Sequence, residues 1–268
     1  MRRAALCQSF SGGSQYLLDE YAQGYAAYSL RNLSSTTIND PLIRVRRSSD
    51  NAEQDFLSNE ITDGTLEAFT GTGVTDFGLV AIWYDQTNNN YNISNTVASN
   101  QPSIIYQGAL LTDPNGKPYV YYNGSNQRGL FIDGLPNVSL NFWVAHEGLS
   151  SQPRNCILNV NGSLAAGVIQ QNSTSSATIQ MSAVTYTKNN QAITPTRGSL
   201  YNELQIDQWT LARLQNVTNL TTIRPFAWES TQNYWNGACR VSEVVGFYTS
   251  QTEIQGVQDN INNYYLIY

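Results

Sequence analysis

The chain has 268 residues, a formal net charge of -6 and a pI near 4.7, so it lacks the basic excess that nucleic-acid binding requires. Charged residues make up only 13% of the chain and hydrophobic residues 41%, which leaves Asn, Gln, Ser, Thr and Tyr to form most of the polar surface. With 17 Tyr and 19 Gly, the composition favours strands and turns over helices.

The first twenty residues contain the Gly-Gly pair of "SFSGGSQ" and show no sustained periodicity. We interpret residues 1–20 as an N-terminal arm and residues 21–268 as one domain. The apolar run from Ala4 to Leu6 is too short for a signal peptide, and no stretch approaches the ~20 apolar residues of a membrane span. We therefore predict neither a signal peptide nor membrane insertion.

Two helices are predicted, one near each end of the domain. The segment "LLDEYAQGYAAYSLRNL" (17–33) carries apolar residues at helical spacing and an acidic pair near its start. The segment Gln251–Asn263 also has apolar residues at helical spacing, with Thr249 or Ser250 as the expected N-cap. These patterns predict a short helix at each position.

Strands dominate between the two helices. The predicted strands are "LIRVRR", "FGLVAIWYD", "KPYVYYNG", "VSLNFWVAHE", "AAGVIQQ", "ATIQMSAVTYT", "QWTLARLQ" and "GACRVSEVVGFYT". Turn-rich pieces such as "DPNGKP" and "NNNYN" separate them. The sequence therefore predicts an all-β sandwich with a small helix at each end.

The stretch "PLIRVRRSSDNAEQDF" concentrates positive charge and then reverses it. On a strand, Arg44 and Arg46 face one side and Arg47 the other, so the arginines cannot form one continuous basic patch. The carboxylates that follow within loop reach are Asp50, Glu53 and Asp55. We predict that these six residues form structural ion pairs, with a carbohydrate contact or nucleic-acid binding as weaker alternatives.

Catalytic chemistry has few candidates. His146 is the only histidine, and we interpret it as a hydrogen-bonded strand-end residue. A glycosidase needs only two carboxylates, and those predicted near strand ends are Asp85, Asp133, Glu147, Glu229 and Glu243. Spacing alone selects no pair among them. For Asp85, a turn in which its carboxylate accepts backbone N–H groups is the favoured interpretation.

An aromatic sugar-binding surface is the other possibility. In "FAWESTQNYWNG", aromatic residues bracket amides, as a saccharide site requires. Aromatic residues of a sandwich lie more often in the core, and the same alternative holds for Tyr119, Tyr121 and Tyr122. The candidate carbohydrate-binding residues are Asp85, Trp228, Asn233, Tyr234, Trp235 and Asn236.

Neither a metal site nor a cofactor is predicted. Cys7, Cys156 and Cys239 match no zinc or redox motif, and the odd count leaves at least one thiol unpaired. We expect reduced, structurally incidental cysteines, and a Cys156–Cys239 bridge remains an alternative.

Three ordered blocks resemble a known module. "VRRSSDNAEQDF", "WYDQTNNNYN" and "NGKPYVYYNGSNQ" follow the order of similar blocks in a module of tailed-phage structural proteins. That module is in turn similar to the catalytic domain of family 54 α-L-arabinofuranosidases. The resemblance spans about residues 21–268 and implies a concanavalin A/laminin-G-type jelly roll of two antiparallel sheets, with glycan affinity. We find no counterpart of the hydrolases' "D-x-E-N-G"-like nucleophile motif, adjacent cysteine pair or additional sugar-binding domain, so no catalytic residue is carried over.

The resemblance leads to a hypothesis about function. We expect a non-enzymatic phage virion protein on the particle surface, as a head fibre, capsid decoration or tail protein, with a lectin-like domain for surface glycan. The arm would bind other virion proteins, and we expect a homo-oligomer, with a trimer favoured. The alternatives are a glycoside hydrolase of arabinofuranosidase type and a purely structural decoration protein without ligand.

Overall fold

A computed structural model describes residues 16–123, 129–148, 154–160, 167–171, 185–194, 196, 198–199, 208–225 and 238–268. The helices are α1 (Leu17–Glu20), α2 (Ser58–Thr62), α3 (Thr65–Thr70), the 3-10 helix η1 (Ala98–Asn100) and α5 (Ile254–Tyr265). The strands are β1 (Gly24–Ser29), β2 (Ile43–Arg47), β3 (Glu53–Phe56), β4 (Gly78–Trp83), β5 (Ile93–Ser94), β6 (Ser103–Tyr106), β7 (Ala109–Leu110), β8 (Val120–Tyr122), β9 (Ile132–Gly148), β10 (Arg154–Asn159), β11 (Gly167–Gln171), β12 (Thr185–Lys188), β13 (Gln191–Ile193), β14 (Thr210–Pro225) and β15 (Cys239–Tyr248). The predicted all-β sandwich is confirmed.

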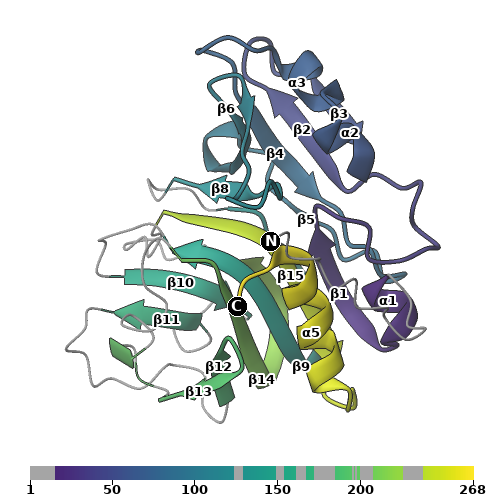
Figure 1. Cartoon of the computed structure of the whole chain (residues 1–268), viewed down its shortest axis with the longest axis vertical. Helices are drawn as coiled ribbons and strands as arrows, with labels where there is room; N and C mark the ends of the chain where they lie inside the picture. Colours follow the sequence, from purple (N-terminus) through teal and green to yellow (C-terminus); the bar gives the residue numbers. More distant parts are fainter. Residues whose placement is uncertain are drawn as a thin grey trace, which may run out of the picture.

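The strands pair antiparallel along one continuous path. Its order is β11-β10-β14-β9-β15-β8-β6-β4-β2-β3, and β1 pairs with β15 beside this path. Figure 1 shows β2, β3, β4 and β6 above the strands of the C-terminal half, while β1 lies level with those strands. The hydrogen bonds therefore pass from one layer to the other without a break in the described part of the chain.

The long strand β14 bends where two asparagines adopt left-handed backbone angles. Asn216 and Asn219 have φ of 58° and 59°, and the β9–β14 register shifts around both positions. Asparagine tolerates this conformation better than other non-glycine residues, and bulges increase the local twist. The buried Asn141 side chain accepts the Asn216 N–H at 2.9 Å, so the bulge leaves this donor satisfied.

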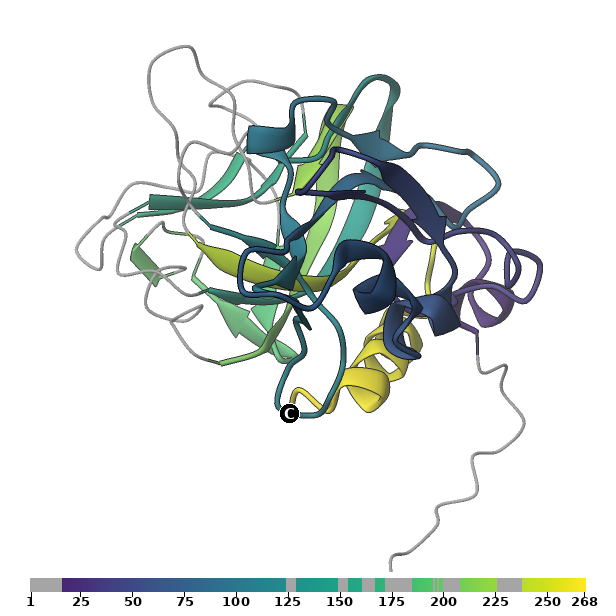
Figure 2. The same cartoon turned by 90° about the horizontal axis from the view of Figure 1, so that it is seen from above.

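Two apolar cores hold the structure together. The larger one fills the space between the layers, and a second lies between α5 and the sheet. In the second core, Val257 and Ile261 of α5 pack with Trp143 of β9 and Phe247 of β15. Figure 1 shows α5 lying across these strands, and Figure 2 places α2 and α3 on the same side of the sandwich.

The predicted helix over residues 17–33 is wrong beyond its first turn. Helix α1 ends at Glu20, and the chain then forms β1, which pairs with β15 over Ala26–Ser29. Residues Tyr25–Ser29 are buried, with members in both cores, so apolar residues on both faces of the strand imitate helical spacing. Long-range pairing overrides the weak helical preference of the alanines.

The closing helix is confirmed, but its predicted cap is wrong. Helix α5 begins at Ile254, and its N-terminal side shows no side-chain cap. Gln251 accepts the Glu253 N–H at 2.9 Å, while the Ser250 hydroxyl contacts Gln23. Glutamine therefore satisfies a backbone group at the turn where a hydroxyl cap was expected.

The described end of the predicted arm packs on the domain. Leu17 of α1 is fully buried in the second core, and the Leu18 N–H donates to Leu33 O at 2.8 Å. Residues 1–15 lie outside the described part of the chain. Cys239 is buried in β15. Cys7 and the side chain of Cys156 lie outside the described part of the chain.

Candidate functional site

The loop that follows β4 is shaped by Asp85, which is buried at 8% exposure. Its carboxylate accepts the Ala27 N–H at 2.8 Å, the Tyr91 N–H at 3.0 Å, and both the N–H and the hydroxyl of Thr87 at 3.0 and 2.6 Å. Burial raises the pKa of Asp85 above its ordinary value, and the hydrogen bonds oppose that rise. The side chain thus acts as the turn-former that the sequence favoured.

Gln86 fixes the same loop to the chain after β1. Its side-chain oxygen accepts the Leu33 N–H at 2.7 Å, and its nitrogen donates to Ser29 O and Arg31 O at 3.2 and 2.9 Å. Since Gln86 is buried, these bonds hold the loop in one position.

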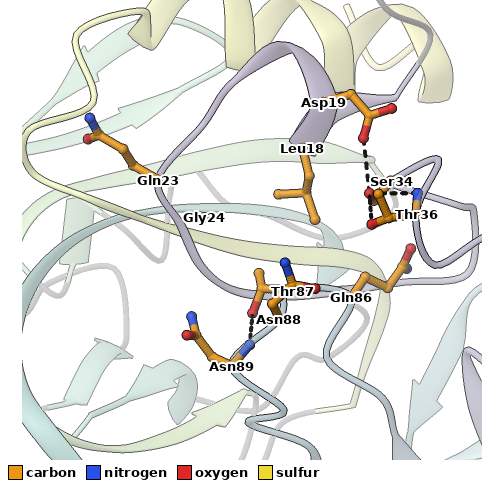
Figure 3. Close-up of a pocket in the computed structure, with 10 residues that line it drawn as sticks. All are labelled: Leu18, Asp19, Gln23, Gly24, Ser34, Thr36, Gln86, Thr87, Asn88 and Asn89. Carbon is orange, nitrogen blue, oxygen red and sulfur yellow. Dashed lines mark hydrogen bonds between the residues drawn. The ribbon is translucent and has the colours of Figure 1, made fainter.

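The held loop forms one wall of a cavity of about 310 Å³. We name this cavity the amide pocket; its lining residues are Leu18, Asp19, Gln23, Gly24, Ser34, Thr36, Gln86, Thr87, Asn88 and Asn89. Figure 3 shows Asp19, Ser34 and Thr36 on one side of Leu18, and Asn88 and Asn89 on another. Asp85 does not line the pocket but positions the residues that do.

The chain enters β1 at Gly24, which lies close to two side chains that line the amide pocket. A Cβ at Gly24 would lie 2.8 Å from Leu18 Cδ2 and 3.3 Å from Thr87 Cγ2. A larger residue would therefore displace the end of the Leu18 side chain and fill part of the space between Leu18 and Thr87.

Several polar atoms of the amide pocket are available to a ligand. Within the described residues, the Asn88 side chain makes no hydrogen bond, and Asn89 uses only its nitrogen, on Tyr25 O at 2.9 Å. The Gln23 oxygen accepts from Ser250, which leaves its amide nitrogen. These amides offer both donors and acceptors without net charge.

Asp19 carries the one charge of the amide pocket. It accepts the Ser34 hydroxyl at 2.9 Å and the Ser35 N–H at 3.1 Å. These hydrogen bonds, first that of Ser35, lower the pKa of Asp19 below its ordinary value. The carboxylate is therefore held ionised, and the pocket suits a neutral ligand rich in hydroxyl groups better than an anion.

Three tyrosines stand beside the amide pocket. The Tyr25 ring lies 5.0 Å from the Tyr91 ring and 5.3 Å from the Tyr248 ring, measured between centroids. Tyr248 is 38% exposed, and its N–H donates to Gln23 O at 3.1 Å. An exposed aromatic ring thus lies next to a pocket-lining residue.

The arginine-rich stretch lies on β2 and pairs with carboxylates. Arg44 makes a bidentate contact with Asp55, with both N···O distances 2.8 Å, across the β2–β3 register. The other two pairs are Arg46 with Glu53 and Arg47 with Asp50. None of the six residues lines the amide pocket.

The carboxylates proposed for hydrolysis are scattered. Glu243 is fully buried and bonded to Arg31, and Glu147 is nearly buried at 2.6 Å from Arg240. Asp133 is half-exposed and accepts the Thr222 hydroxyl at 2.7 Å. Glu229 lies outside the described residues. A retaining glycosidase needs two carboxylates about 5–5.5 Å apart, and the amide pocket supplies one.

His146 is buried in β9. Burial, with Lys188 nearby, lowers the pKa of His146 to about 4, so the imidazole is neutral near pH 7. It is enclosed within the sheet and does not line the amide pocket.

All of the predicted aromatic platform (residues 226–237) lies outside the described residues, including Trp228, Asn233, Tyr234, Trp235 and Asn236. Among the other three tyrosines considered, Tyr119 and Tyr122 are buried, as expected of core residues. Tyr121 is half-buried against Tyr106, with 6.4 Å between the ring centroids.

The described residues also bear on metal and membrane binding. Among them, no three His, Cys, Asp or Glu side chains gather as a metal site would require. No helix in these segments has the length and apolarity to cross a membrane.

The residues that line the amide pocket were not predicted from the sequence. Asp19, Ser34 and Asn88 come from separate segments, and only the fold brings them together. The one available signal was the asparagine run directly after the turn-forming Asp85.

Comparisons with protein-family models and with curated proteins find no match. Comparison with solved structures finds arabinofuranosidases. An α-L-arabinofuranosidase of glycoside hydrolase family 54 soaked with a cyclic sulfate inhibitor is similar with a TM-score of 0.51 and 15% identity. A Glu-to-Gln variant of a family 54 enzyme soaked with 4-nitrophenyl α-L-arabinofuranoside has a TM-score of 0.54 and 16% identity. An arabinofuranosidase complexed with arabinofuranosyl-α-1,2-xylobiose has a TM-score of 0.53 and 16% identity.

The likeness is one of fold. The alignments cover 88% of this chain but only 61–62% of the arabinofuranosidase chains, so the chain spans about three fifths of their length. This agrees with the concanavalin A-like jelly roll that the sequence blocks imply, and it leaves activity to be argued from the site.

Proposed function

We propose that the chain is a non-enzymatic, lectin-like structural protein of a phage virion and that it binds surface glycan through the amide pocket. The observation that carries the binding role is the pocket itself: uncharged amides with unused hydrogen-bonding atoms, on a rigid loop, in a fold similar to that of saccharide-processing enzymes.

The chemistry of the pocket matches a saccharide. Sugar hydroxyls both donate and accept hydrogen bonds, and the side-chain amides of Asn88, Asn89 and Gln23 do the same. Tyr248 offers an exposed ring on which the apolar face of a second sugar unit can pack. Because Asp85 and Gln86 hold the loop before any ligand arrives, binding loses little conformational entropy.

Glycan-array screening, followed by NMR titration of the best saccharide, tests the proposal. Asn88→Ala removes an amide that makes no hydrogen bond in the described part of the protein, so the fold should not change. We expect about fivefold weaker binding from the loss of one net hydrogen bond. Asn88→Trp should fill the pocket and abolish binding, whereas the exposed Asn39→Ala should have no effect. Binding unchanged in both Asn88 variants would disprove the assignment.

Hydrolysis of an arabinofuranoside is the second candidate, because the chain shares its fold with arabinofuranosidases. The amide pocket holds one carboxylate, Asp19, so this reaction would need a second one from elsewhere. Incubation with 4-nitrophenyl α-L-arabinofuranoside separates the two functions. Turnover that one carboxylate substitution abolishes would replace the lectin proposal with the enzyme.

The virion assignment rests on the ordered sequence blocks. It includes attachment to other virion proteins through the N-terminal arm, assembly into a trimer and display on the particle surface. Deleting residues 1–15 tests the attachment, because this truncation keeps the buried Leu17 and α1. We expect a folded domain that no longer incorporates into particles. Normal incorporation of the truncated protein would contradict the attachment. An antibody against the protein that labels no particle would contradict the virion assignment. A decoration protein without a ligand would be labelled on particles but would bind no glycan.

A further inference from the structure

A second cavity, of about 420 Å³, lies between the chain that follows β5 and the start of β9. We name it the Asn100 pocket. The lining residues used below are Ser94, Asn95, Val97, Asn100, Phe131 and Asp133. None of them lines the amide pocket, so the two cavities have separate walls except for the loop that continues from Asn89 to Asn92.

The frame of the Asn100 pocket is fixed by hydrogen bonds. Asn95 is buried; its nitrogen donates to Gly129 O at 2.7 Å and its oxygen accepts the Val97 N–H at 3.0 Å. Ser94 and Phe131 exchange two backbone hydrogen bonds, at 3.0 and 3.2 Å. The cavity therefore exists before a ligand binds.

Three polar side chains that line this pocket have unused hydrogen-bonding atoms. In the described part of the chain, the half-buried side chains of Ser94 and Asn100 make no hydrogen bond. Asp133 uses one oxygen to accept the Thr222 hydroxyl, and its other oxygen lies 4.0 Å from the Arg224 guanidinium. The Asp133 side chain is 56% exposed, so that second oxygen can accept from a ligand.

An apolar wall completes the pocket. Phe131 is held by the guanidinium of Arg224, which lies 4.1 Å from the ring centroid and is itself buried. Val97 is 51% exposed at the mouth. An aromatic ring beside a carboxylate, an amide and a hydroxyl can contact both the C–H face and the hydroxyl groups of a sugar.

We propose that the Asn100 pocket is a second saccharide site, whose ligand presents adjacent free hydroxyl groups to Asp133. The second oxygen of Asp133 has two lone pairs, so it can accept hydrogen bonds from two neighbouring hydroxyl groups while the first oxygen keeps its bond to Thr222. Asn100 and Ser94 can then bond the next hydroxyl. Two sites on one domain would raise the apparent affinity for a polysaccharide through multivalency. This site does not depend on the amide pocket, so each can fail in experiment without the other.

The test is an NMR titration of isotope-labelled Asn88→Trp protein, in which the amide pocket is filled. The probes are the methyl glycosides of D-glucose, D-mannose, D-galactose and L-rhamnose. We expect at least one to shift the side-chain amide of Asn100 and the backbone amides of Ser94 and Phe131. Absence of these shifts with all four probes would overturn the proposal.

Matched variants decide whether the shifts report this pocket. Asp133→Asn should weaken binding about tenfold, because a hydrogen bond to a charged acceptor is stronger than one to a neutral acceptor. The exposed Asp40→Asn removes a carboxylate outside the pocket and should change nothing. Val97→Trp blocks the mouth from an exposed position, so it tests the site even where Asp133→Asn disturbs Arg224. Binding that survives both pocket variants would refute the site.

Discussion

The carboxylate of Asp85 and the backbone N–H of Ala27 form a 2.8 Å hydrogen bond between residues 58 positions apart in the chain. This bond joins the loop after β4 to β1, which packs against the last strand. The wall of the amide pocket is thereby tied to the centre of the sheet.

Replacing Asp85 should therefore cost both stability and pocket shape. Asp85→Ala leaves the buried N–H groups of Ala27 and Thr87 without their acceptor, and each such group costs about 1–3 kcal/mol. We expect the free energy of unfolding, measured in urea, to fall by roughly 2–5 kcal/mol. Asp85→Asn keeps one oxygen acceptor, so its free energy of unfolding should lie between those of Asp85→Ala and the natural protein. A loss as small as that of an exposed Asp40→Asn control would contradict this role.

A buried ion pair fastens α5 to the sheet. Arg31 contacts Glu243 at 2.9 and 3.1 Å and Asn260 of α5 at 2.9 Å, and its guanidinium lies 4.5 Å from the Tyr264 ring centroid. Arg31→Leu leaves the fully buried Glu243 without its counter-charge, which costs about 3–5 kcal/mol.

Hydrogen exchange measures this effect locally. The amides of α5 in Arg31→Leu should lose protection before those of β2. In the double variant Arg31→Leu/Glu243→Leu neither charge of the pair remains, so much of the stability should return. Equal stability of the single and double variants would show that the pair is not coupled.

Charge reversal tests the pairs on β2. Arg46 and Glu53 face each other across the β2–β3 register, so Arg46→Glu would set two carboxylates side by side. We expect a loss of about 1 kcal/mol, or about 2–4 °C in Tm, by thermal unfolding. The exchanged pair Arg46→Glu/Glu53→Arg should recover most of it. An unchanged Tm in the single variant would mean that the pairing contributes nothing to stability.

His146 should make the protein sensitive to acid. Its folded pKa of about 4 lies below the unfolded value of about 6.5, so between these values the unfolded chain binds more protons. The neutral imidazole therefore makes its full contribution to the free energy of unfolding above pH 6.5. This contribution, up to roughly 3 kcal/mol, is lost as the pH falls toward 4.

The comparison variant is His146→Gln, which does not titrate. Unfolding free energies measured from pH 7 to pH 4 should fall more steeply for the natural protein than for this variant. Parallel curves would mean that His146 titrates alike in both states, although carboxylates such as Asp50 would still make both curves decline.

The sequence predicted elements whose patterns are local. The alternation of "LIRVRR" indicated a strand with two apolar residues inward, and Ile43 and Val45 are indeed fully buried in β2. The helical spacing near the end indicated α5 to within a few residues. In both cases one face of the element is apolar and the other is not, so the period can be read.

The failures occur where burial is two-sided or where a site combines distant segments. β1 is buried on both faces, so its tyrosines and alanines carry no period of two. Asn88 and Asp19 belong to the same pocket only because Asp85 and Gln86 anchor the loop beneath α1. Hydrogen bonds between residues so far apart leave no pattern that a short window of sequence can reveal.

The pairing of β1 with β15 also sets the order in which the protein can fold during its synthesis. The Ser29 hydroxyl bonds to Glu243, 214 residues later, so the ribosome must make nearly the whole domain before β1 finds its neighbour. Until then the edge of β1 stays open to other nascent chains, and closing so large a loop is slow. The sheet can therefore be completed only after β15 has been synthesised, and its yield depends on what shields β1 until then.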